Sequence, residues 1–516
     1  TVKQAKRRIE TPIKAKDDCE MINTYYPGQR ELNLRSDIAA ENPLYIYTHP
    51  DYMLYSNSVT ALLSDDRVRV KVSSSGLSFL LQSGVVPPPA TIYQNVYVLG
   101  FGDSLKVTTE KGRVVTHFHH KFPFRRNQRT EAPPVSTDKE DIFSLLSAAM
   151  AERLKVGRPS FLFHSAGKDS NMLACAAAEA GWQDRITLLT HHSNGGNDES
   201  EISESIARKL GFRHQVLEEV DRLGESEKSA IESFFINAPF PGIDPVTLAY
   251  PLYTLQVEGL ISGSNIIDGG GNDCYLFIPP SMKDYRMLPI LNYSSRLAWL
   301  RYLTASESRL APLLKTPAEH YGMSGLSTRD ALRIYPAGEA VYDHWRRISD
   351  QRSELDAVEH KTDIHAGITA AELHIRKVRS FSDAFNHNLV LPFSSSSVAS
   401  YFSRLPEKAL FDTASGKNKL IFRSILKEHI GLDSDKIGKM GYSYNFTSVI
   451  NMNRKLILET ILTSSLWNTA AVNKLLERCY ATANSRHKYA RMLARNIYRL
   501  YLISGWYQHC KYLDHE

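Results

Sequence analysis

An alternation of apolar runs with helical patterns in the middle of the chain most constrains what this sequence can fold into. Three strand-like runs are separated by helical patterns that stop at Gly181 and Gly211, and the runs are residues 160–164, 186–191 and 214–218. Strands that alternate with helices in this way form a parallel sheet covered by helices. The pattern therefore predicts an α/β fold whose ligands bind beyond the carboxyl ends of the strands.

The residues on either side of this alternation have different patterns. Residues 43–124 carry short strand-like runs separated by turn residues, and the clearest runs are 44–47, 52–55 and 94–99. Beyond about Asp284 the patterns are mostly helical, and the last helix is expected to bury one face that carries Ala490, Leu493, Ile497 and Leu500. The N-terminal part is therefore expected to be β-rich and the C-terminal part helical.

A boundary between two domains is expected near residue 130. Residues 131–136 read as a proline-containing linker, and Thr137 with Glu140 predicts a capping box at the start of the next helix. We therefore expect a β-rich domain over residues 1–130. The second domain, residues 131–516, is expected to hold the parallel sheet and the helical C-terminal part.

The composition limits which cellular environment and which binding partners are expected. The 62 basic and 56 acidic residues nearly balance over 516 residues, so the charge gives no reason to expect nucleic-acid binding. The five cysteines are scattered and lack C-x-x-C spacing, which disfavours a disulfide framework or a structural zinc site. No apolar run reaches the ~18 residues of a membrane span. We therefore expect a cytoplasmic protein without membrane or nucleic-acid partners.

The turn after the first of these strands has the pattern of a phosphate loop. It reads Ser165-Ala166-Gly167-Lys168-Asp169-Ser170 and opens a helix, whose N-terminal N–H groups favour an anion. It is not the G-x-x-x-x-G-K-[ST] loop, because Asp169 follows Lys168. A kinase or GTPase is therefore a poor interpretation.

A second glycine-rich turn ends in a carboxylate. Asp268-Gly269-Gly270-Gly271-Asn272-Asp273 follows another strand-like run, and its glycines let the backbone approach a ligand closely. Asp169 and Asp273 are expected to converge on one Mg²⁺ that bridges ATP phosphates, because this hard cation takes few carboxylates plus phosphate oxygens.

Together these segments resemble the asparagine synthetase family, which includes the β-lactam and carbapenam synthetases and the lasso-peptide cyclases. The first turn is similar to the S-G-G-x-D-S loop of ATP pyrophosphatases, with Ala166 for one glycine, and the second to S-G-x-G-x-D-x-x-F-G-G. Three later segments resemble further family motifs in the same order, and they are Leu391-Pro392-Phe393, 417–423 and Lys439-Met440-Gly441. The resemblance covers about residues 140 to 450.

The resemblance implies a role for each matching residue. The ATP-binding residues would be Ser165, Gly167, Asp169, Ser170, Gly269 and Lys419, with Lys419 at the β and γ phosphates. Asp169 and Asp273 would hold Mg²⁺. Lys439 would be the catalytic residue that stabilises charge at the reacting carbonyl or α-phosphate. The C-terminal domain would then be an ATP-pyrophosphatase domain of the adenine nucleotide α-hydrolase type.

Two departures from the family pattern narrow the expected activity. The family's glutaminase uses an N-terminal cysteine, whereas this sequence begins with Thr1 and its first cysteine is Cys19, so a degenerate glutaminase-like domain is expected. Gly270 stands where relatives have Glu or Tyr, which leaves the general base unassigned. Glu372, Tyr275 and Tyr442 are conceivable bases, and each also has a structural interpretation.

A metal site on His117, His119 and His120 is disfavoured, because no carboxylate or cysteine is placed in the sequence to complete it.

The resemblance implies an AMP- and pyrophosphate-forming ligase that adenylates a substrate carboxylate and closes an intramolecular amide. A lasso-peptide cyclase of antibiotic biosynthesis, which forms a macrolactam, is the preferred interpretation. A β-lactam-type synthetase, an intermolecular ammonia or amine ligase and a non-catalytic ATP-binding scaffold are the alternatives. Expected partners are a carboxylate-bearing substrate such as a precursor peptide, and a protease or leader-binding protein. Substrate, ring size and oligomeric state stay open.

Overall fold

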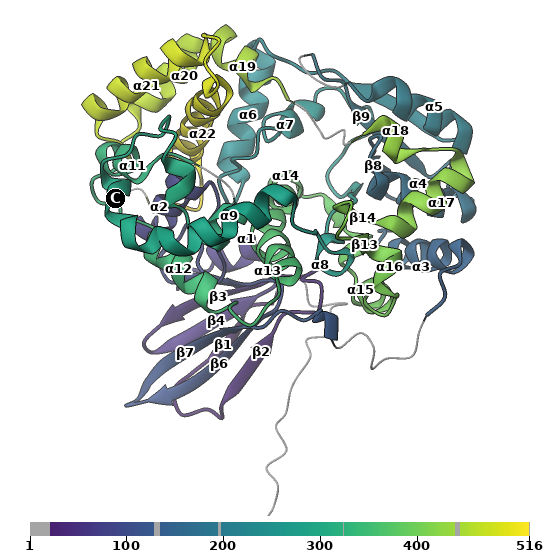
Figure 1. Cartoon of the computed structure of the whole chain (residues 1–516), viewed down its shortest axis with the longest axis horizontal. Helices are drawn as coiled ribbons and strands as arrows, with labels where there is room; N and C mark the ends of the chain where they lie inside the picture. Colours follow the sequence, from purple (N-terminus) through teal and green to yellow (C-terminus); the bar gives the residue numbers. More distant parts are fainter. Residues whose placement is uncertain (1–20, 128–134, 195–197, 323–324, 439–443, 515–516) are drawn as a thin grey trace, which may run out of the picture.

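The computed structural model describes residues 21–127, 135–194, 198–322, 325–438 and 444–514. The fold is mixed α/β, with antiparallel sheets in residues 21–127, which we call the β region, and a parallel sheet and many helices in residues 135–514, which we call the α/β region (Figure 1). None of the helices in these ranges is both long and apolar enough to cross a membrane.

The β region contains two antiparallel sheets. One has the order β1-β4-β3-β5 and the other β2-β6-β7. Their bounds are β1 Asn23–Tyr25, β2 Leu32–Arg35, β3 Leu44–His49, β4 Tyr52–Ser56, β5 Val96–Leu99, β6 Asp103–Glu110 and β7 Arg113–His120. Buried side chains from both sheets, including Leu34, Ile46, Met53 and Leu105, form one cluster. The three strands predicted at 44–47, 52–55 and 94–99 are confirmed as β3, β4 and β5.

The α/β region is built on one five-stranded sheet. Its strands are β8 Ser160–Phe163, β9 Ile186–His191, β10 Arg213–Leu217, β11 Asn265–Ile267 and β12 Asn388–Val390. Every neighbouring pair is parallel. Helices α4 (Lys168–Glu179) and α5 (Ser200–Leu210) connect the first three strands. The predicted parallel sheet is confirmed, whereas β12 was not expected among the helical patterns.

The order of the strands singles out one place on the sheet. The strand order across the sheet is β10-β9-β8-β11-β12. Strands β9 and β10 follow β8 on one side, and the chain then crosses over so that β11 and β12 lie on the other side of β8. The segments that follow β8 and β11 therefore leave adjacent strand ends in opposite directions. Such a reversal of strand order leaves a crevice at the carboxyl ends, which is where open α/β sheets bind ligands.

The predicted capping box at Thr137 and Glu140 is wrong. Helix α3 spans Lys139–Ala151, and its N-cap is Asp138, which makes no side-chain capping hydrogen bond. Ser136 Oγ instead accepts a hydrogen bond from the Asp138 N–H at 3.0 Å. This local turn moves the helix start by one residue, so Glu140 is the second helical residue and cannot reach back as a box requires. Most of the expected linker lies outside the described residues.

Helices at the end of the chain pack around α22 (Ala490–His509), which is buried along most of its length. Its neighbours are α6 Glu225–Asn237, α19 Phe446–Met452, α20 Arg454–Thr463 and α21 Thr469–Ala483. Figure 1 shows this group in yellow with α6 beside it. Leu493, Ile497 and Leu500 are buried, as predicted. The hydrophobic cluster of these helices also contains Leu54 and Val96, so the two regions share a core.

One long helical stretch changes its geometry in the middle. It runs as α13 (Ala357–Ile364), a π-helical segment, η4 (His365–Ile375), and α14 (Arg376–Ala384). π-Helical geometry is rare, is found mostly as single turns inside α-helices, and frequently occurs at functional sites. Residues of this segment line two cavities at the end of the parallel sheet.

Candidate functional site

The turn after β8 is held by its own polar side chains. Ser165 Oγ accepts a hydrogen bond from the Gly167 N–H at 3.1 Å, and Ser170 Oγ lies 3.3 Å from Ser165 Oγ. Asn171 Nδ2 donates to the carbonyl oxygens of Ser165 and Gly167 at 2.8 and 2.6 Å. The N-cap of α4 is Gly167, so no side chain caps this helix. An uncapped helix N-terminus at a strand end is suited to an anion.

A buried carboxyl that the sequence analysis missed adjoins this turn. Glu199 is 5% exposed, and its Oε2 accepts a hydrogen bond from the Ala166 N–H at 2.7 Å. Burial raises the pKa of Glu199 above its ordinary value. Its only signal in the sequence is its position just before α5, where a helix-capping role is the simpler interpretation.

The turn after β11 contacts the turn after β8 through glycine. A Cβ atom at position 269 would lie 3.1 Å from Asp169 Cβ and 3.2 Å from the Ser170 nitrogen. Gly271 has a φ of +103°, and a Cβ atom there would overlap the Ser394 hydroxyl. Glycine at these two positions therefore lets the two turns and the segment after β12 meet.

Two carboxylates converge on one cation where these turns meet. Lys419 Nζ lies 2.6 Å from Asp169 Oδ2 and 3.0 Å from Asp273 Oδ1, and it donates to Asn272 Oδ1 at 2.7 Å. Lys419 is 6% exposed and takes a φ of +56° at the start of α17 (Leu420–Ile430). The structure therefore brings Asp169 and Asp273 together, as the sequence analysis expected, and places Lys419, predicted at the β and γ phosphates, in contact with both. It adds that the ammonium group stands between the two carboxylates.

Mutual attraction keeps Asp273 and Lys419 ionised. Burial alone would raise the pKa of Asp273, but the attraction of Lys419 and a contact with His365 Nε2 at 3.5 Å hold that pKa well below its ordinary range. Burial would lower the pKa of Lys419, and the two carboxylates outweigh it and raise that pKa. At neutral pH Lys419 is therefore a buried cation that faces the ionised carboxylate of Asp273.

The donor set fits one kind of metal. Within the described ranges, no group of three or more His, Cys, Asp or Glu side chains is placed to hold a metal ion. Two carboxylates that face one point suit Mg²⁺, which usually takes one or two carboxylates and completes its shell with phosphate oxygens and water. The cluster therefore fits a phosphate-bound Mg²⁺ better than a metal held by protein ligands alone.

One cavity, which we call the loop cavity, is bounded by both turns. It is lined by Ser165, Gly167, Asp169, Ser170, Gly269, Gly270, Gly271, Asn272 and Asp273, with Tyr250, His374 and Lys377 among the further residues. Every residue predicted to bind ATP lines it except Lys419, whose ammonium group contacts three of its wall residues, Asp169, Asn272 and Asp273. Lys439, the predicted catalytic residue, lies outside the described residues.

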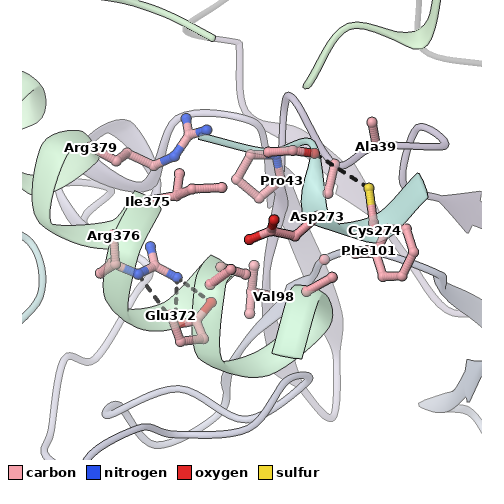
Figure 2. A pocket seen from close by; sticks show the side chains of 16 residues that line it. Ala39, Pro43, Val98, Phe101, Asp273, Cys274, Glu372, Ile375, Arg376 and Arg379 are labelled. Carbon is pink, nitrogen blue, oxygen red and sulfur yellow. Dashed lines mark hydrogen bonds and ion pairs between the residues drawn. The ribbon is translucent and has the colours of Figure 1, made fainter. Parts of the chain in front are cut away.

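A second cavity lies between the β region and the π-helical segment (Figure 2). We call it the inter-region cavity. Its wall is mostly small or apolar, with Ala39, Pro43, Val98, Phe101, Ala366, Ala370 and Ala371, and its polar groups include Glu372, Arg376 and Arg379. Gly271, Asp273, Ala370 and Ile375 line both cavities. The two cavities are therefore neighbours that meet at Asp273.

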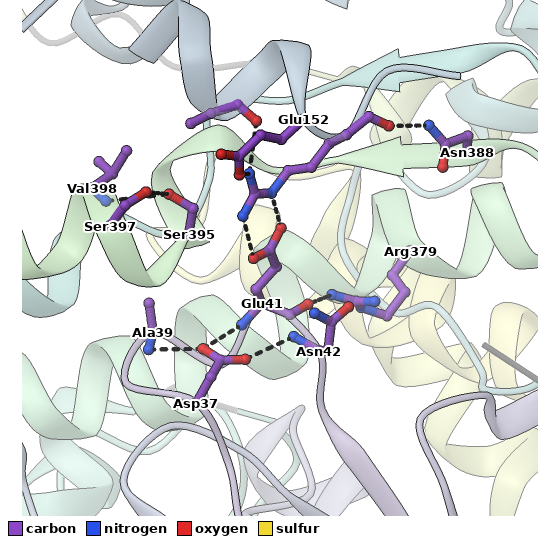
Figure 3. Close-up of polar contacts among 12 residues, drawn as sticks. Asp37, Ala39, Glu41, Asn42, Glu152, Arg379, Asn388, Ser395, Ser397 and Val398 are labelled. Carbon is purple, nitrogen blue, oxygen red and sulfur yellow. Dashed lines mark hydrogen bonds and ion pairs between the residues drawn. The ribbon is translucent and has the colours of Figure 1, made fainter. Parts of the chain in front are cut away.

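The wall contributed by the β region is tied to the α/β region by polar contacts (Figure 3). Asp37 accepts hydrogen bonds from the backbone N–H groups of Ala39, Glu41 and Asn42 at 3.0 to 3.1 Å. Glu41 forms an ion pair with Arg153, and its carbonyl oxygen accepts a hydrogen bond from Arg379 at 2.9 Å. These contacts fix the loop that places Ala39 beside Asp273.

Two of the three conceivable bases have other partners. Glu372 accepts two hydrogen bonds of 2.7 Å from Arg376 Nη2, and Arg376 also contacts the Tyr45 hydroxyl at 3.1 Å. Tyr275 is fully buried, and its hydroxyl donates to the Phe393 carbonyl at 2.8 Å. Both contacts are structural. Tyr442 lies outside the described residues.

Position 270 faces the π-helical segment. A Cβ atom on Gly270 would lie 3.0 Å from Asp268 Oδ1 and 3.1 Å from Ile375 Cγ1. A larger side chain would require Ile375 to shift. This crowding explains why glycine is accommodated at position 270 more easily than a larger side chain such as Glu or Tyr.

Carboxylates adjoin one of the histidines of β7, although within the described residues no cluster of His, Cys, Asp and Glu is placed to hold a metal ion. His120 Nδ1 lies 2.8 Å from Asp103 Oδ1, and His120 Nε2 lies 2.9 Å from Asp363 Oδ2, because the fold brings a helix of the α/β region against β7. Burial opposes protonation, but the two carboxylates outweigh it and raise the pKa of His120 to about 9. Both ring nitrogens are engaged, so this histidine is an ion-pair partner.

Comparison of the chain with protein-family models finds no match, and comparison with curated proteins also finds none.

Proposed function

We propose that this chain is an ATP-dependent ligase that splits ATP between the α and β phosphates and uses the adenylate to form an amide. The observation that carries the proposal is the convergence of Asp169 and Asp273 on one cation at the strand-order reversal. An uncapped helix N-terminus beside them supplies N–H groups for an anion. A kinase-type phosphate loop is absent from the full sequence, which disfavours transfer of the γ-phosphate.

The proposed binding mode assigns the phosphates of ATP and the accompanying Mg²⁺ to described groups. The turn at 165–170 would hold the pyrophosphate, and Asp169 and Asp273 would hold Mg²⁺ together with phosphate oxygens. Bound Mg²⁺ would neutralise phosphate charge. Lys419 is already ionised and buried beside both carboxylates, so it would add a fixed positive charge near the β and γ phosphates.

The proposed reaction has two steps. A substrate carboxylate oxygen attacks the α-phosphorus, and the bond to pyrophosphate breaks. An amine nitrogen then attacks the acyl carbon, the bond to AMP breaks, and the amine loses a proton. Fixed cations aimed at the developing charge typically contribute a few kcal/mol to such steps. Lys439 is assigned to this role by the resemblance, and the base that accepts the proton is unassigned.

The inter-region cavity is the proposed site for the acyl part of the substrate. It meets the loop cavity at Asp273, and its alanine-rich wall suits an apolar group of modest size. In this proposal the β region corresponds to a degenerate glutaminase-like domain, and the α/β region to an ATP-pyrophosphatase domain. Ring closure within a peptide, as in a lasso-peptide cyclase, is the preferred reaction.

Analysis of the nucleotide products tests the proposal. The chain would be incubated with ATP, Mg²⁺ and peptides that have a free N-terminal amine and an internal Asp or Glu. We expect AMP and pyrophosphate in equal amounts, and loss of both with Asp169→Asn. Asp435→Asn is the matched control, because Asp435 is an exposed carboxylate that pairs with Lys417 and Arg423 away from the cavity. Formation of ADP and phosphate would contradict the proposal.

A further inference from the structure

Large apolar side chains are exposed along one stretch of the described chain, residues 282–313. The stretch contains α9 (Met282–Tyr293), the 3₁₀ helix η2 (Ser294–Tyr302) and the start of η3 (Ala311–Leu314). Its exposed side chains are Met282, Tyr285, Ile290, Tyr293, Leu297, Trp299, Tyr302, Leu303, Leu310 and Leu313. Trp299 is 59% exposed and Leu303 is 64% exposed. Exposed apolar residues gathered in this way mark interaction surfaces.

The same stretch carries an excess of outward positive charge. Lys283, Arg286, Arg296 and Arg309 are exposed, and within the described residues none of the four is seen in an ion pair with a carboxylate. The two carboxylates of the stretch already have partners, Asp284 with His320 and Lys361, and Glu307 with Arg478. The surface is therefore basic as well as apolar, and we call residues 282–313 the basic-apolar segment.

The charge of this segment restricts what can cover it. A second copy bound by the same face would bring like charges together, which costs binding energy. A partner with acidic side chains would instead pair with the four cations. Arg296 also lies over the Tyr293 ring at 5.2 Å from its centroid, so this guanidinium is held close to the exposed aromatic groups.

The shape of the surface distinguishes a polypeptide from a lipid surface. One cavity beside the segment is lined by Thr304, Ala311, Pro312 and Leu314 among others. A second cavity is lined by Leu288, Leu291 and Asn292 with residues of α10 and α12, which span Pro317–Tyr321 and Tyr342–Asp350. Side chains of a peptide can enter such cavities as anchors. A flat bilayer surface makes no use of them.

We propose that the basic-apolar segment binds a polypeptide that carries acidic side chains interspersed with large apolar ones. The apolar side chains contact Trp299, Leu303 and their neighbours and enter the flanking cavities. The acidic side chains pair with Arg286, Arg296 and Arg309. This proposal does not depend on the function proposed above, since it uses none of the residues of the loop cavity.

A selection from random short peptides displayed on phage tests the proposal with the full chain as bait. We expect the selected peptides to be rich in Asp and Glu together with Leu, Phe or Trp. One selected peptide, labelled with fluorescein, would be titrated by anisotropy. Trp299→Ala and Arg296→Glu should each weaken its binding about tenfold or more, and added salt should weaken it further. Leu255→Ala and Met452→Ala, which change apolar side chains that are 50% and 55% exposed elsewhere, should leave it unchanged.

Several results would overturn the proposal. No enrichment of acidic-apolar peptides, or peptide binding unaffected by Trp299→Ala and Arg296→Glu, would do so. Binding to phosphatidylcholine–phosphatidylglycerol vesicles that is lost in these variants would assign the segment to a lipid surface instead. Self-association in sedimentation experiments that is lost in Trp299→Ala would assign it to a second copy. Thermal melting of each variant shows whether a loss of binding comes from unfolding, and Leu303→Ala serves as the replacement if Trp299→Ala does not fold.

Discussion

The β region and the α/β region use their charged side chains differently. In the α/β region Asp169, Asp273 and Lys419 gather at one point at the end of the parallel sheet, beside a cavity. In the β region the carboxylates of Asp37 and Glu41 fix a loop and its contact with the other region. We infer that the α/β region holds the reacting groups and that the β region supplies a fixed wall.

The largest expected effect comes from breaking a charged contact between the regions. Asp363 is fully buried, and it accepts a hydrogen bond of 2.7 Å from Arg352 and pairs with His120 of the β region. Asp363→Ala should lower the free energy of unfolding by about 3–5 kcal/mol, because it leaves the buried Arg352 guanidinium without its anion and removes one of the two carboxylates that contact His120. Urea unfolding measures this loss. ATP affinity measured below the unfolding transition should stay near the wild-type value, and a selective loss of ATP affinity would break the comparison.

The next largest effect is expected at the convergent carboxylates. Asp273→Asn should weaken Mg²⁺-dependent ATP binding about a hundredfold, which is about 2.7 kcal/mol, because one of two anionic ligands becomes neutral. Calorimetric titration with ATP, in the presence and absence of Mg²⁺, measures it. Asp412→Asn is the control, because Asp412 is an exposed carboxylate at the end of strand β13 (Phe411–Asp412). If ATP binding by Asp273→Asn depends on Mg²⁺ as it does in the wild type, Asp273 is not part of the metal site.

A smaller effect on the free energy of unfolding is expected when the pH is raised. The pKa of His120 is raised from 6.5 to about 9 in the folded chain, where Asp363, Asp103 and Arg352 face it. A raised folded-state pKa means that the stabilisation is fully present below pH 6.5 and is lost as the pH rises through 9. Across this window the free energy of unfolding should fall by on the order of 2 kcal/mol more in the wild type than in His120→Asn. Equal pH profiles of the two proteins in urea unfolding would refute the assignment.

The smallest effect is expected at the ion pair that holds the loop of the cavity wall. Glu41 and Arg153 have side chains that are 17% and 20% exposed, so solvent screens their attraction in part. Glu41→Gln should cost about 1 kcal/mol of stability. Glu152 contacts the same arginine but is 58% exposed, so Glu152→Gln should have no measurable effect. If the two variants unfold alike, the loop is not held by this pair.

Local sequence patterns predicted the parts of the fold that local chemistry determines. Buried strands followed by small residues predicted β8, β9 and β11 and the two turns that meet, because short apolar runs and glycines carry their own signal. The three-residue strand β12 has too little periodicity to be recognised among helices. The π-helical geometry of 365–375 also has no signal, since its sequence is compatible with an ordinary helix.

Contacts between distant residues escaped the sequence analysis for a different reason. Lys419 reaches Asp169 and Asp273 only because it takes a left-handed conformation at the start of α17, which no neighbouring glycine signals. Asp363 lies 243 residues from His120 along the chain, whereas Asp103 faces His120 across the pair of neighbouring strands β6 and β7. A sequence pattern identifies groups able to carry charge, whereas the choice of partner depends on the packed fold.

The ammonium group between the two carboxylates has a consequence for the order of ligand arrival. A divalent cation that comes alone meets the positive charge of Lys419 at the point where both carboxylates face. Nucleotide phosphates bring enough negative charge to accommodate both cations at once. Under the proposed function, metal and nucleotide should therefore enter as a complex, and the lysine would neutralise the two carboxylates when no ligand is bound.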